Sequence, residues 1–203
     1  KITHYGNIVD HNFITTHPSV FLKQNRNIKN LHFMFIPVDK NIECFDVYNL
    51  KPRKDIFYAM SHGVNRATLK KGKNDSRIYF LNSLIKKING INYDFYGFEN
   101  KEPIWGDNFY NALTNSKMGL NLSRGLPTKY YSSNRIASLI GNGLMTFIDK
   151  RTSLNEIFNS KEVVFYTSID DLSSKIKFYK GKDSLRKQIA KKGKNKYFKL
   201  FNE

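Results

Sequence analysis

The sequence predicts an α/β fold with a doubly wound, Rossmann-like parallel sheet, preceded by an N-terminal remnant or linker segment. Two observations predict it: short apolar runs alternate with helical patterns from residue 55 onward, and glycine-containing turns follow several of these runs. With 203 residues, 40% of them hydrophobic, the chain can bury a sizeable core. The apolar run at 30–39 contains a proline near its end and leads into a linker-like stretch, so we expect an N-terminal segment over 1–50 and a sheet domain over 51–203.

Strands and helices are expected to alternate along the sheet domain. Five apolar runs of strand length are expected to form the sheet: 56–60, 93–98, 118–122, 144–148 and 162–166. Apolar periodicity and capping residues predict the helices: one between Ser76 and Asn89, a short one at 109–114, one between Asn134 and Asn142, a turn at 154–158, one from a capping box at Ser168 and Asp171 to Tyr179, and a basic one at 183–201.

The chain is strongly basic. Its 34 Lys and Arg against 17 Asp and Glu give a net charge of +17, which favours phosphate-bearing partners such as nucleic acid, nucleotide-sugars or an anionic membrane. The stretch 175–203 holds eleven basic and two acidic residues and so supplies +9 of that charge. A second interpretation stays open, in which a lysine-rich composition produces solvated basic helix faces without a specific partner.

The sequence also limits the compartment and the class of protein. Cys44 is the one cysteine, so we expect no disulfide framework, a reducing compartment and a buried, inert thiol. No apolar run is long enough to span a bilayer. These features predict a cytoplasmic protein whose basic tail can contact the inner membrane face. The motifs GxGxxG, GxxxxGK[ST], HExxH and GxSxG are absent, which argues against the usual dinucleotide-binding oxidoreductases, P-loop enzymes, zincins and α/β-hydrolases.

Candidate binding residues follow the expected strands. Ligands of open α/β sheets bind beyond the carboxyl ends of the strands, and three segments there carry suitable groups: 61–66, 123–125 and 132–135. The last segment combines hydroxyl, amide and guanidinium groups at an expected helix start, in Ser132, Ser133, Asn134 and Arg135. A diphosphate would suit it. The alternative is that a residue of this segment only caps the helix and that Arg135 points into water.

Further candidates are individually weaker. His62 beside Gly63 could contact a ligand or could be a hydrogen-bonding loop residue. The guanidinium groups of three arginines could reach phosphates or could be solvated: Arg66, Arg77 and Arg124. Tyr131, in an aromatic stretch, could stack on a base or belong to the core.

Several segments, in order, resemble the C-terminal domain of group 1 glycosyltransferases of the GT-B type, specifically the spore-maturation-protein-like (CgeB-like) family. They are FYNALTNSKMGLNLSR, SSNRIASLIGNG, LMTFID, LNEIF, EVVFYTSIDDL and the Lys-rich last helix, with MSHGVNR and the helix from Arg77 upstream. Arg135 and Gly143 match the family pattern around the key helix. Ser138 stands where the family has an acid that contacts the ribose, and Tyr130 where it has an acid that contacts the sugar.

The resemblance implies a metal-independent, hexosyltransferase-type glycosyltransferase of polysaccharide biosynthesis. It would move a sugar from a UDP- or GDP-linked donor, a substrate rather than a cofactor, to a cell-surface glycan, lipid or protein acceptor. Residues 1–50 would end an acceptor-type domain, and 51–203 would bind the nucleotide-sugar. The resemblance places two residues near the nucleoside or sugar, Tyr131 and Ser138, and five at the phosphates: Arg77, Arg124, Ser133, Asn134 and Arg135.

Two alternatives stay open beside the enzyme. One is a glycosyltransferase-like domain without activity, since both acids of the family pair are replaced. The other is a basic nucleic-acid-binding protein, which explains the charge but not the grouping of capping residues, glycines and arginines at strand ends. No catalytic residue, metal ligand or stereochemical outcome is assigned.

Overall fold

The computed structural model describes residues 6, 8–23, 28–61, 68–69, 73–131 and 133–202. Five parallel strands form the central sheet: β3 (Lys54–Ala59), β6 (Tyr93–Tyr96), β7 (Ser116–Asn121), β8 (Met145–Asp149) and β9 (Val164–Tyr166). They lie in the order β6-β3-β7-β8-β9, so by chain order the sheet reads 2-1-3-4-5. The five strands expected from the sequence and the doubly wound topology are confirmed.

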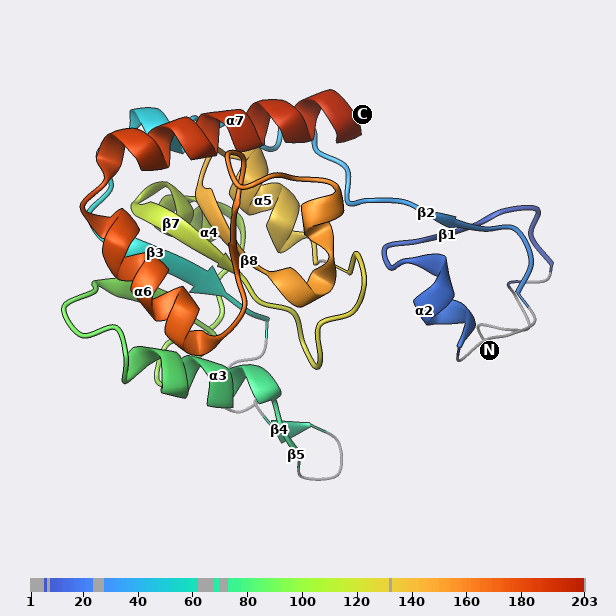
Figure 1. Cartoon of the computed structure of the whole chain (residues 1–203), viewed down its shortest axis with the longest axis horizontal. Helices are drawn as coiled ribbons and strands as arrows, with labels where there is room; N and C mark the ends of the chain where they lie inside the picture. Colours follow the sequence, from blue (N-terminus) through green and yellow to red (C-terminus); the bar gives the residue numbers. More distant parts are fainter. Residues whose placement is uncertain are drawn as a thin grey trace.

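Helices cover both faces of this sheet (Figure 1). They are α3 (Ser76–Ile85), α4 (Gly106–Thr114), α5 (Arg135–Gly141), α6 (Ile169–Lys180) and α7 (Asp183–Phe201). Alternate residues of β3 show the two layers. Ile56 and Tyr58 share a core cluster with α3 and α6, whereas Phe57 and Ala59 share one with α4 and α5. A strand buried on both faces requires the unbroken apolar run that the sequence has here.

Local interactions set the helix ends. Asp75 caps α3, accepting the backbone N–H of Arg77 at 3.0 Å. Ser168 caps α6 through the N–H of Asp171 at 3.1 Å, as expected, but the Asp171 carboxylate reaches back to the N–H of Thr167, one residue before the cap. The basic helix α7 has the bounds expected from the sequence.

Helix α7 lies along the molecule against α5 (Figure 1). Gly193 lets α7 lie close to the turn before β9, because a Cβ there would lie 2.2 Å from the carbonyl oxygen of Glu162. Short 3₁₀ turns fill the connections around the sheet: η1 (Val47–Asn49), η3 (Lys150–Thr152) and η4 (Leu154–Glu156). The antiparallel pair β4 (Thr68–Leu69) and β5 (Lys73–Asn74) precedes α3.

The N-terminal residues form a small βαβ unit beside the sheet domain (Figure 1). Strands β1 (Asn12–Ile14) and β2 (Leu31–Phe33) pair in parallel, with α2 (Pro18–Leu22) between them in the chain. Within the expected strand at 30–39, only the first part is a strand. The rest packs along α7. The Tyr197 hydroxyl donates to the carbonyl oxygen of Ile36 at 2.7 Å, and the N–H of Val38 donates to the carbonyl oxygen of Phe201 at 3.0 Å.

The edge strand β9 has a neighbour on its open side. Lys175 of α6 donates its ammonium group to the carbonyl oxygen of Phe165 at 2.7 Å and to the Asp171 carboxylate at 2.8 Å. One of the outward-facing backbone acceptors of the edge is thereby occupied.

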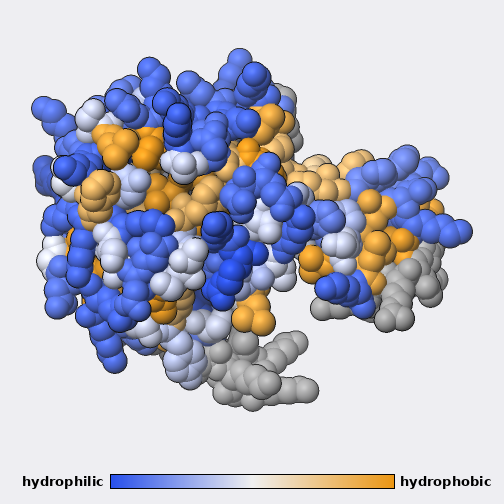
Figure 2. Space-filling view, viewed as in Figure 1, coloured by the Kyte–Doolittle hydropathy of each residue, from blue (hydrophilic) through white to orange (hydrophobic). Residues whose placement is uncertain are grey.

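The surface is largely hydrophilic, with apolar groups visible both on the main body and on the N-terminal unit at the right of the view (Figure 2). Ile8, Val9, Phe13 and Met34 are among its exposed large apolar residues. Cys44 is exposed, so the expectation of a buried thiol is wrong. No helix among the described residues has the length and apolarity that crossing a bilayer demands.

Candidate functional site

The strand order creates a crevice between β3 and β7 at their carboxyl ends. From β3 the chain crosses one face of the sheet through α3 to reach β6, and from β7 it crosses the other face through α5 to reach β8. Connections that leave two neighbouring strands toward opposite faces open a gap above the strand ends. Ligands of open α/β sheets bind at this kind of switch point.

Arg135, the first residue of α5, lies in this crevice. Its Nε donates to the Ala59 carbonyl at the end of β3 at 2.8 Å, and its Nη1 donates to the Leu122 carbonyl after β7 at 2.9 Å. The guanidinium carbon lies 4.7 Å from the centre of the Tyr58 ring. The side chain therefore ties the two strand ends together and does not point into water, which removes that alternative.

Arg135 lacks a carboxylate partner among the described residues, where no Asp or Glu oxygen lies within 4.0 Å of it. Burial lowers the pKa of the Arg135 guanidinium, and the nearby Arg77 charge lowers it further, while Tyr58 acts in the opposite direction. A partly buried cation without a carboxylate is costly unless an anion joins it, so its electrostatics favour an anionic ligand.

A pocket of about 650 Å³ opens beside Arg135. Its wall is formed by the end of β3, the start of α4 and the start of α5. Thr15 of the N-terminal unit and Ile36, in the segment that connects this unit to the sheet domain, complete it. The lining residues are Thr15, Ile36, Ala59, Met60, Ser61, Ile104, Trp105, Gly106, Phe109, Tyr110, Tyr131, Ser133, Asn134, Arg135 and Ser138. None of them is acidic, and four are aromatic. We call this space the switch-point pocket.

Five of the residues expected from the sequence meet in the switch-point pocket: Tyr131, Ser133, Asn134, Arg135 and Ser138. Arg77 instead forms a buried pair with Asp75, with Nε at 2.9 Å from Oδ1, and lines a second, smaller pocket. Arg124 is half exposed, with its Nε 3.9 Å from Asp75. Four other candidates lie outside the described residues: His62, Gly63, Arg66 and Ser132.

The start of α5 differs from the expected capping arrangement. The Asn134 backbone is already helical, and its side chain makes no cap bond. Ser133 accepts a hydrogen bond from Nη1 of Arg135 at 3.2 Å, and Ser138 donates to the Asn134 carbonyl at 3.5 Å. Because α5 is only 7 residues long, its dipole is a minor source of positive charge, and Arg135 supplies most of it.

Tyr130, at the position of the first family acid, takes a separate role. Its backbone has a φ of +62°, and its ring packs 5.0 Å from that of Phe33 and 5.2 Å from that of His17, measured between centres. Its hydroxyl donates to the Glu156 carboxylate, which raises the pKa of Tyr130. Tyr130 therefore joins the N-terminal unit to the loop after β7.

Sequence reasoning missed the wall contributed by α4. Trp105 is 63% exposed beside the pocket, and Gly106 opens α4 with a φ of +54°. Phe109 and Tyr110 complete this wall. Because this loop follows a parallel strand, it reaches the same edge of the sheet as the loops after β3 and β7, but its place beside them depends on the strand order.

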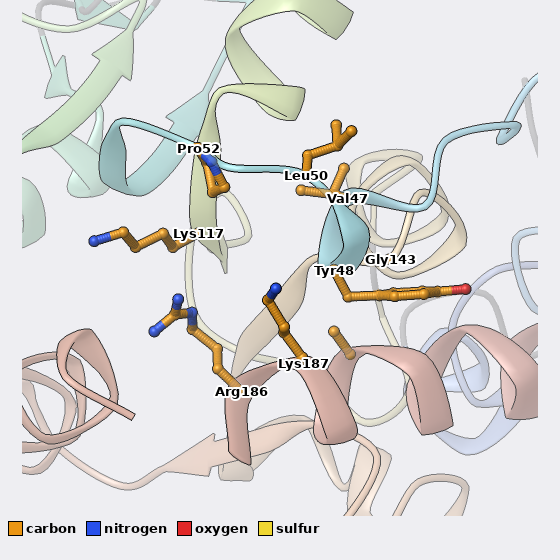
Figure 3. Close-up of a pocket in the computed structure, with 9 residues that line it drawn as sticks. Val47, Tyr48, Leu50, Pro52, Lys117, Gly143, Arg186 and Lys187 are labelled. Carbon is orange, nitrogen blue, oxygen red and sulfur yellow. The ribbon is translucent and has the colours of Figure 1, made fainter. Parts of the chain in front are cut away.

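Another pocket, at the opposite edge of the sheet, holds only about 20 Å³, room for roughly one water molecule. Figure 3 shows that Lys117, Arg186 and Lys187 surround it. Lys117 is bound to Asp55 at 3.0 Å and Arg186 to Asp183 at 2.5 Å. Within the described part of the chain, no group of three His, Cys, Asp or Glu residues is arranged to hold a metal ion.

Solved glycosyltransferase structures share this fold. A glycosyltransferase from Rickettsia africae aligns with a TM-score of 0.66 and 13% identity, over 99% of this chain and 62% of its own. TarM aligns with a TM-score of 0.65 and 14% identity, over 98% and 42%. Anabaena Alr3699/HepE, solved with UDP, aligns with a TM-score of 0.60 and 10% identity, over 98% and 62%. This chain thus spans about half the length of the proteins it resembles.

Sequence comparison assigns the family. No curated protein matches the chain significantly. A family model described as glycosyl transferase-like matches residues 76–202, which include α3 to α7 and the second to fifth strands of the central sheet. The chain therefore belongs to the glycosyl transferase-like family.

Proposed function

We propose that this chain is the donor-binding half of a GT-B glycosyltransferase, which moves a sugar from a nucleotide-sugar to a glycan, lipid or protein acceptor. The observation that carries the proposal is the partly buried Arg135 at the switch point between β3 and β7, with no acid near it among the described residues. A diphosphate would supply the missing negative charge. During transfer, the same cation would stabilise the charge that develops on the leaving diphosphate.

The shape of the switch-point pocket supports a nucleotide as the ligand. Its volume of about 650 Å³ suits a nucleotide better than a simple anion. The exposed face of Trp105, with Tyr110 and Tyr131 in the same wall, suits stacking on a base. We assign Ser133, Asn134 and Arg135 to the phosphates and Ser138 to the nucleoside or sugar. Anabaena HepE was solved with UDP, which supports a uridine donor.

The N-terminal unit supports a two-domain enzyme. Strands β1 and β2 form only a two-stranded parallel sheet, and exposed Phe13 and Met34 lie on or beside it. Parallel strands are stable when larger sheets and helices bury both of their faces. We therefore assign 1–50 to the end of an acceptor-type domain with its linker, and 51–203 to the donor domain. The solved relatives, about twice as long, are consistent with this division.

A second candidate function is donor binding without transfer. It is favoured by the absence of acids from the described lining of the switch-point pocket and by Ser138 and Tyr130 at the two family acid positions. The proposed assignment to the CgeB-like family within the glycosyltransferases rests on the segment that contains Tyr130 and Ser138. Transfer to a glycan acceptor by the full reading frame supports the enzyme, whereas tight UDP binding without transfer or donor hydrolysis supports the binding domain.

Thermal unfolding with UDP, GDP and their sugar conjugates tests the proposal. A ligand at a hundred times its Kd stabilises the native state by about 2.7 kcal/mol, which raises Tm by roughly 5–10 °C for a chain of this size. Arg135→Ala should abolish the shift, while Arg53→Ala, an exposed arginine at the other edge, should leave it intact.

Because Arg135→Ala also strips two carbonyls of their donor, Trp105→Ala is the second variant. Trp105 is 63% exposed, so its removal should leave Tm nearly unchanged. Loss of base stacking should weaken nucleotide affinity by about 1–3 kcal/mol. An unchanged wild-type Tm with every nucleotide tested would contradict the donor-binding proposal.

We also propose a cytoplasmic protein that touches an anionic membrane through α7. Exposed Lys187, Lys191, Lys192 and Lys199 line the outer side of this helix. Each lysine near an anionic surface contributes about 1 kcal/mol. Co-sedimentation with phosphatidylserine vesicles at low salt, lost at high salt and absent with neutral vesicles, is expected. Binding to RNA and not to vesicles would favour the nucleic-acid alternative.

A further inference from the structure

Two short sequence motifs of the same form face one cavity. In Asp75-Ser76-Arg77 and Asp149-Lys150-Arg151, the aspartate caps a helical turn and also grips the arginine two residues later. Asp75 Oδ1 accepts from the N–H of Arg77 at 3.0 Å and from its Nε at 2.9 Å. Asp149 Oδ1 accepts from the N–H of Arg151 at 2.9 Å and from its Nε at 3.0 Å. In each motif Nη2 reaches Oδ2 as well.

These pairs hold two planar guanidinium groups in fixed orientations. Carboxylates that bind an arginine at Nε and Nη2 fix the plane of its fork, so little rotamer entropy is left to lose on binding a ligand. Asp75 and Asp149 are buried, with 0% and 5% exposure. A helix cap works equally well at the surface, so capping alone does not account for burying both carboxylates.

Arg77, Asp149 and Arg151 line a cavity of about 110 Å³ at the carboxyl ends of β7 and β8. Asn121 and Ser123 add polar groups, and apolar surface comes from Phe80, Leu122, Leu126 and Pro127. Leu126 is 82% exposed and so lies at the mouth. Gly125, with a φ of +75°, lets the chain turn back there.

The charges of this cavity select an uncharged ligand. Each guanidinium already has its own carboxylate, and Asp149 itself lines the wall, so an anion gains little attraction and meets a negative group. The volume of about 110 Å³ admits a short polyol or part of a sugar ring and excludes a nucleotide. Planar polar groups facing an apolar surface match a molecule with hydroxyls on its rim and C–H groups on its face.

We propose that this cavity is a second ligand site, for a single polyhydroxylated ring or short polyol such as one unit of a carbohydrate. The end of β7 separates it from the switch-point pocket: Leu122 lines the cavity, while its carbonyl accepts from Arg135. The site does not depend on donor binding. In a glycosyltransferase it would hold a sugar unit beside the donor pocket, on the α3 side of the sheet.

Saturation-transfer NMR on the whole chain tests this, with free monosaccharides and glycerol as probes, alone and with saturating UDP. Sugar signals that persist with UDP are expected. Arg151→Lys keeps the charge but loses the fork and should weaken binding about tenfold. Leu126→Ser, at an exposed position, should weaken it a few-fold without changing Tm. Trp105→Ala should weaken the binding of UDP and leave the binding of the sugar unchanged. A preference for monosaccharides over glycerol identifies a ring as the ligand, and the reverse identifies a linear polyol.

Three outcomes overturn the proposal: no signal from any probe with folded protein, a signal that UDP displaces, or phosphate binding in place of sugar. The first leaves the donor proposal intact if UDP still binds. Sugar binding without any nucleotide binding would support the second site and contradict the donor-binding function. Equal sugar affinities of wild type and Arg151→Lys would show that the Arg151 guanidinium does not bind the sugar, which contradicts the proposed site.

Discussion

Asp55 at the amino edge of the sheet is a buried charge and Arg135 at the carboxyl edge is a partly buried one, and their surroundings differ. Asp55 accepts from Lys117 Nζ at 3.0 Å, from Lys180 Nζ at 3.1 Å and from the N–H of Asn92 at 2.9 Å. Arg135 contacts carbonyls, a hydroxyl and an aromatic ring, with no acid near it among the described residues. At one edge the charges close the fold, and at the other they leave a place for a ligand.

The pockets follow the same division. The amino edge holds about 20 Å³ beside the paired Lys117 and Arg186 (Figure 3). The carboxyl edge holds about 650 Å³ around Arg135, which has no carboxylate partner among the described residues. A net charge of +17 therefore says little by itself, because its effect depends on whether an acid neutralises each cation locally. Among the described residues, Arg135 differs from Lys117 and Arg186 in having no carboxylate partner.

Asp55→Ala should have the largest effect on stability. Removing a buried carboxylate leaves two ammonium groups and one backbone N–H without their acceptor, at a cost of about 3–5 kcal/mol in the free energy of unfolding. Urea unfolding measures the loss, and UDP affinity of the folded variant should stay unchanged. Equal weakening of UDP binding by Asp55→Ala and Arg135→Ala would contradict the assignment of Asp55 to the stability of the fold and of Arg135 to ligand binding.

Two glycines with the same φ angle provide a matched pair of positions for substitution. Gly143 at the amino edge and Gly125 at the carboxyl edge both have a φ of +75°. A Cβ at Gly143 would lie 2.7 Å from the Tyr48 ring, whereas one at Gly125 would meet nothing within 4 Å. Gly143→Ala should cost roughly 2–4 kcal/mol and Gly125→Ala about 1 kcal/mol. Equal losses of stability would show that the amino edge is less tightly packed than described.

Acid should weaken the amino edge selectively. Burial acts to raise the pKa of Asp55, but the bonds from Asn92, Lys117 and Lys180 outweigh it and hold that pKa below its usual range. A depressed folded pKa gives stability that is complete above the unfolded value of about 3.9 and is lost as pH falls through the folded value. The stability gap between wild type and Asp55→Ala should therefore narrow below about pH 4. Urea midpoints across this range test it, and a constant gap would contradict it.

Lys187→Ala should have the smallest effect. Lys187 is exposed beside the small pocket of Figure 3 and has no ion pair among the described residues. Its removal should change the free energy of unfolding by less than about 0.5 kcal/mol and leave nucleotide binding unaltered. A measurable loss of UDP or phosphate affinity would reveal an anion site at the amino edge.

The fold was accessible from the sequence because its signals are local. The apolar runs of β3 and β7, the capping box at Ser168 and the periodicity of α7 each lie within about twenty residues. The sequence also placed Arg135 at a strand-end loop. It could not show that this side chain bridges Ala59 and Leu122, because contacts over 76 residues depend on which strands become neighbours.

The missed parts of the site have the same cause. Trp105 and Gly106 reach the pocket only because β6 lies beside β3, an order that apolar periodicity does not encode. Cys44 was expected to be buried from its residue type alone, but it lies in an exposed part of the connection before η1. The pairing of Arg77 with Asp75 was visible as a spacing of two residues, yet the spacing did not indicate that a second such pair would face it.

The contact between Lys175 and Phe165 has a consequence for how this molecule behaves at high concentration. An edge strand with free backbone groups can recruit a strand from another molecule and begin aggregation. With an ammonium group seated on an outer carbonyl of β9, an incoming chain would have to displace a charge before it could pair. The last strand of the sheet is thus protected by a side chain from the helix that follows it.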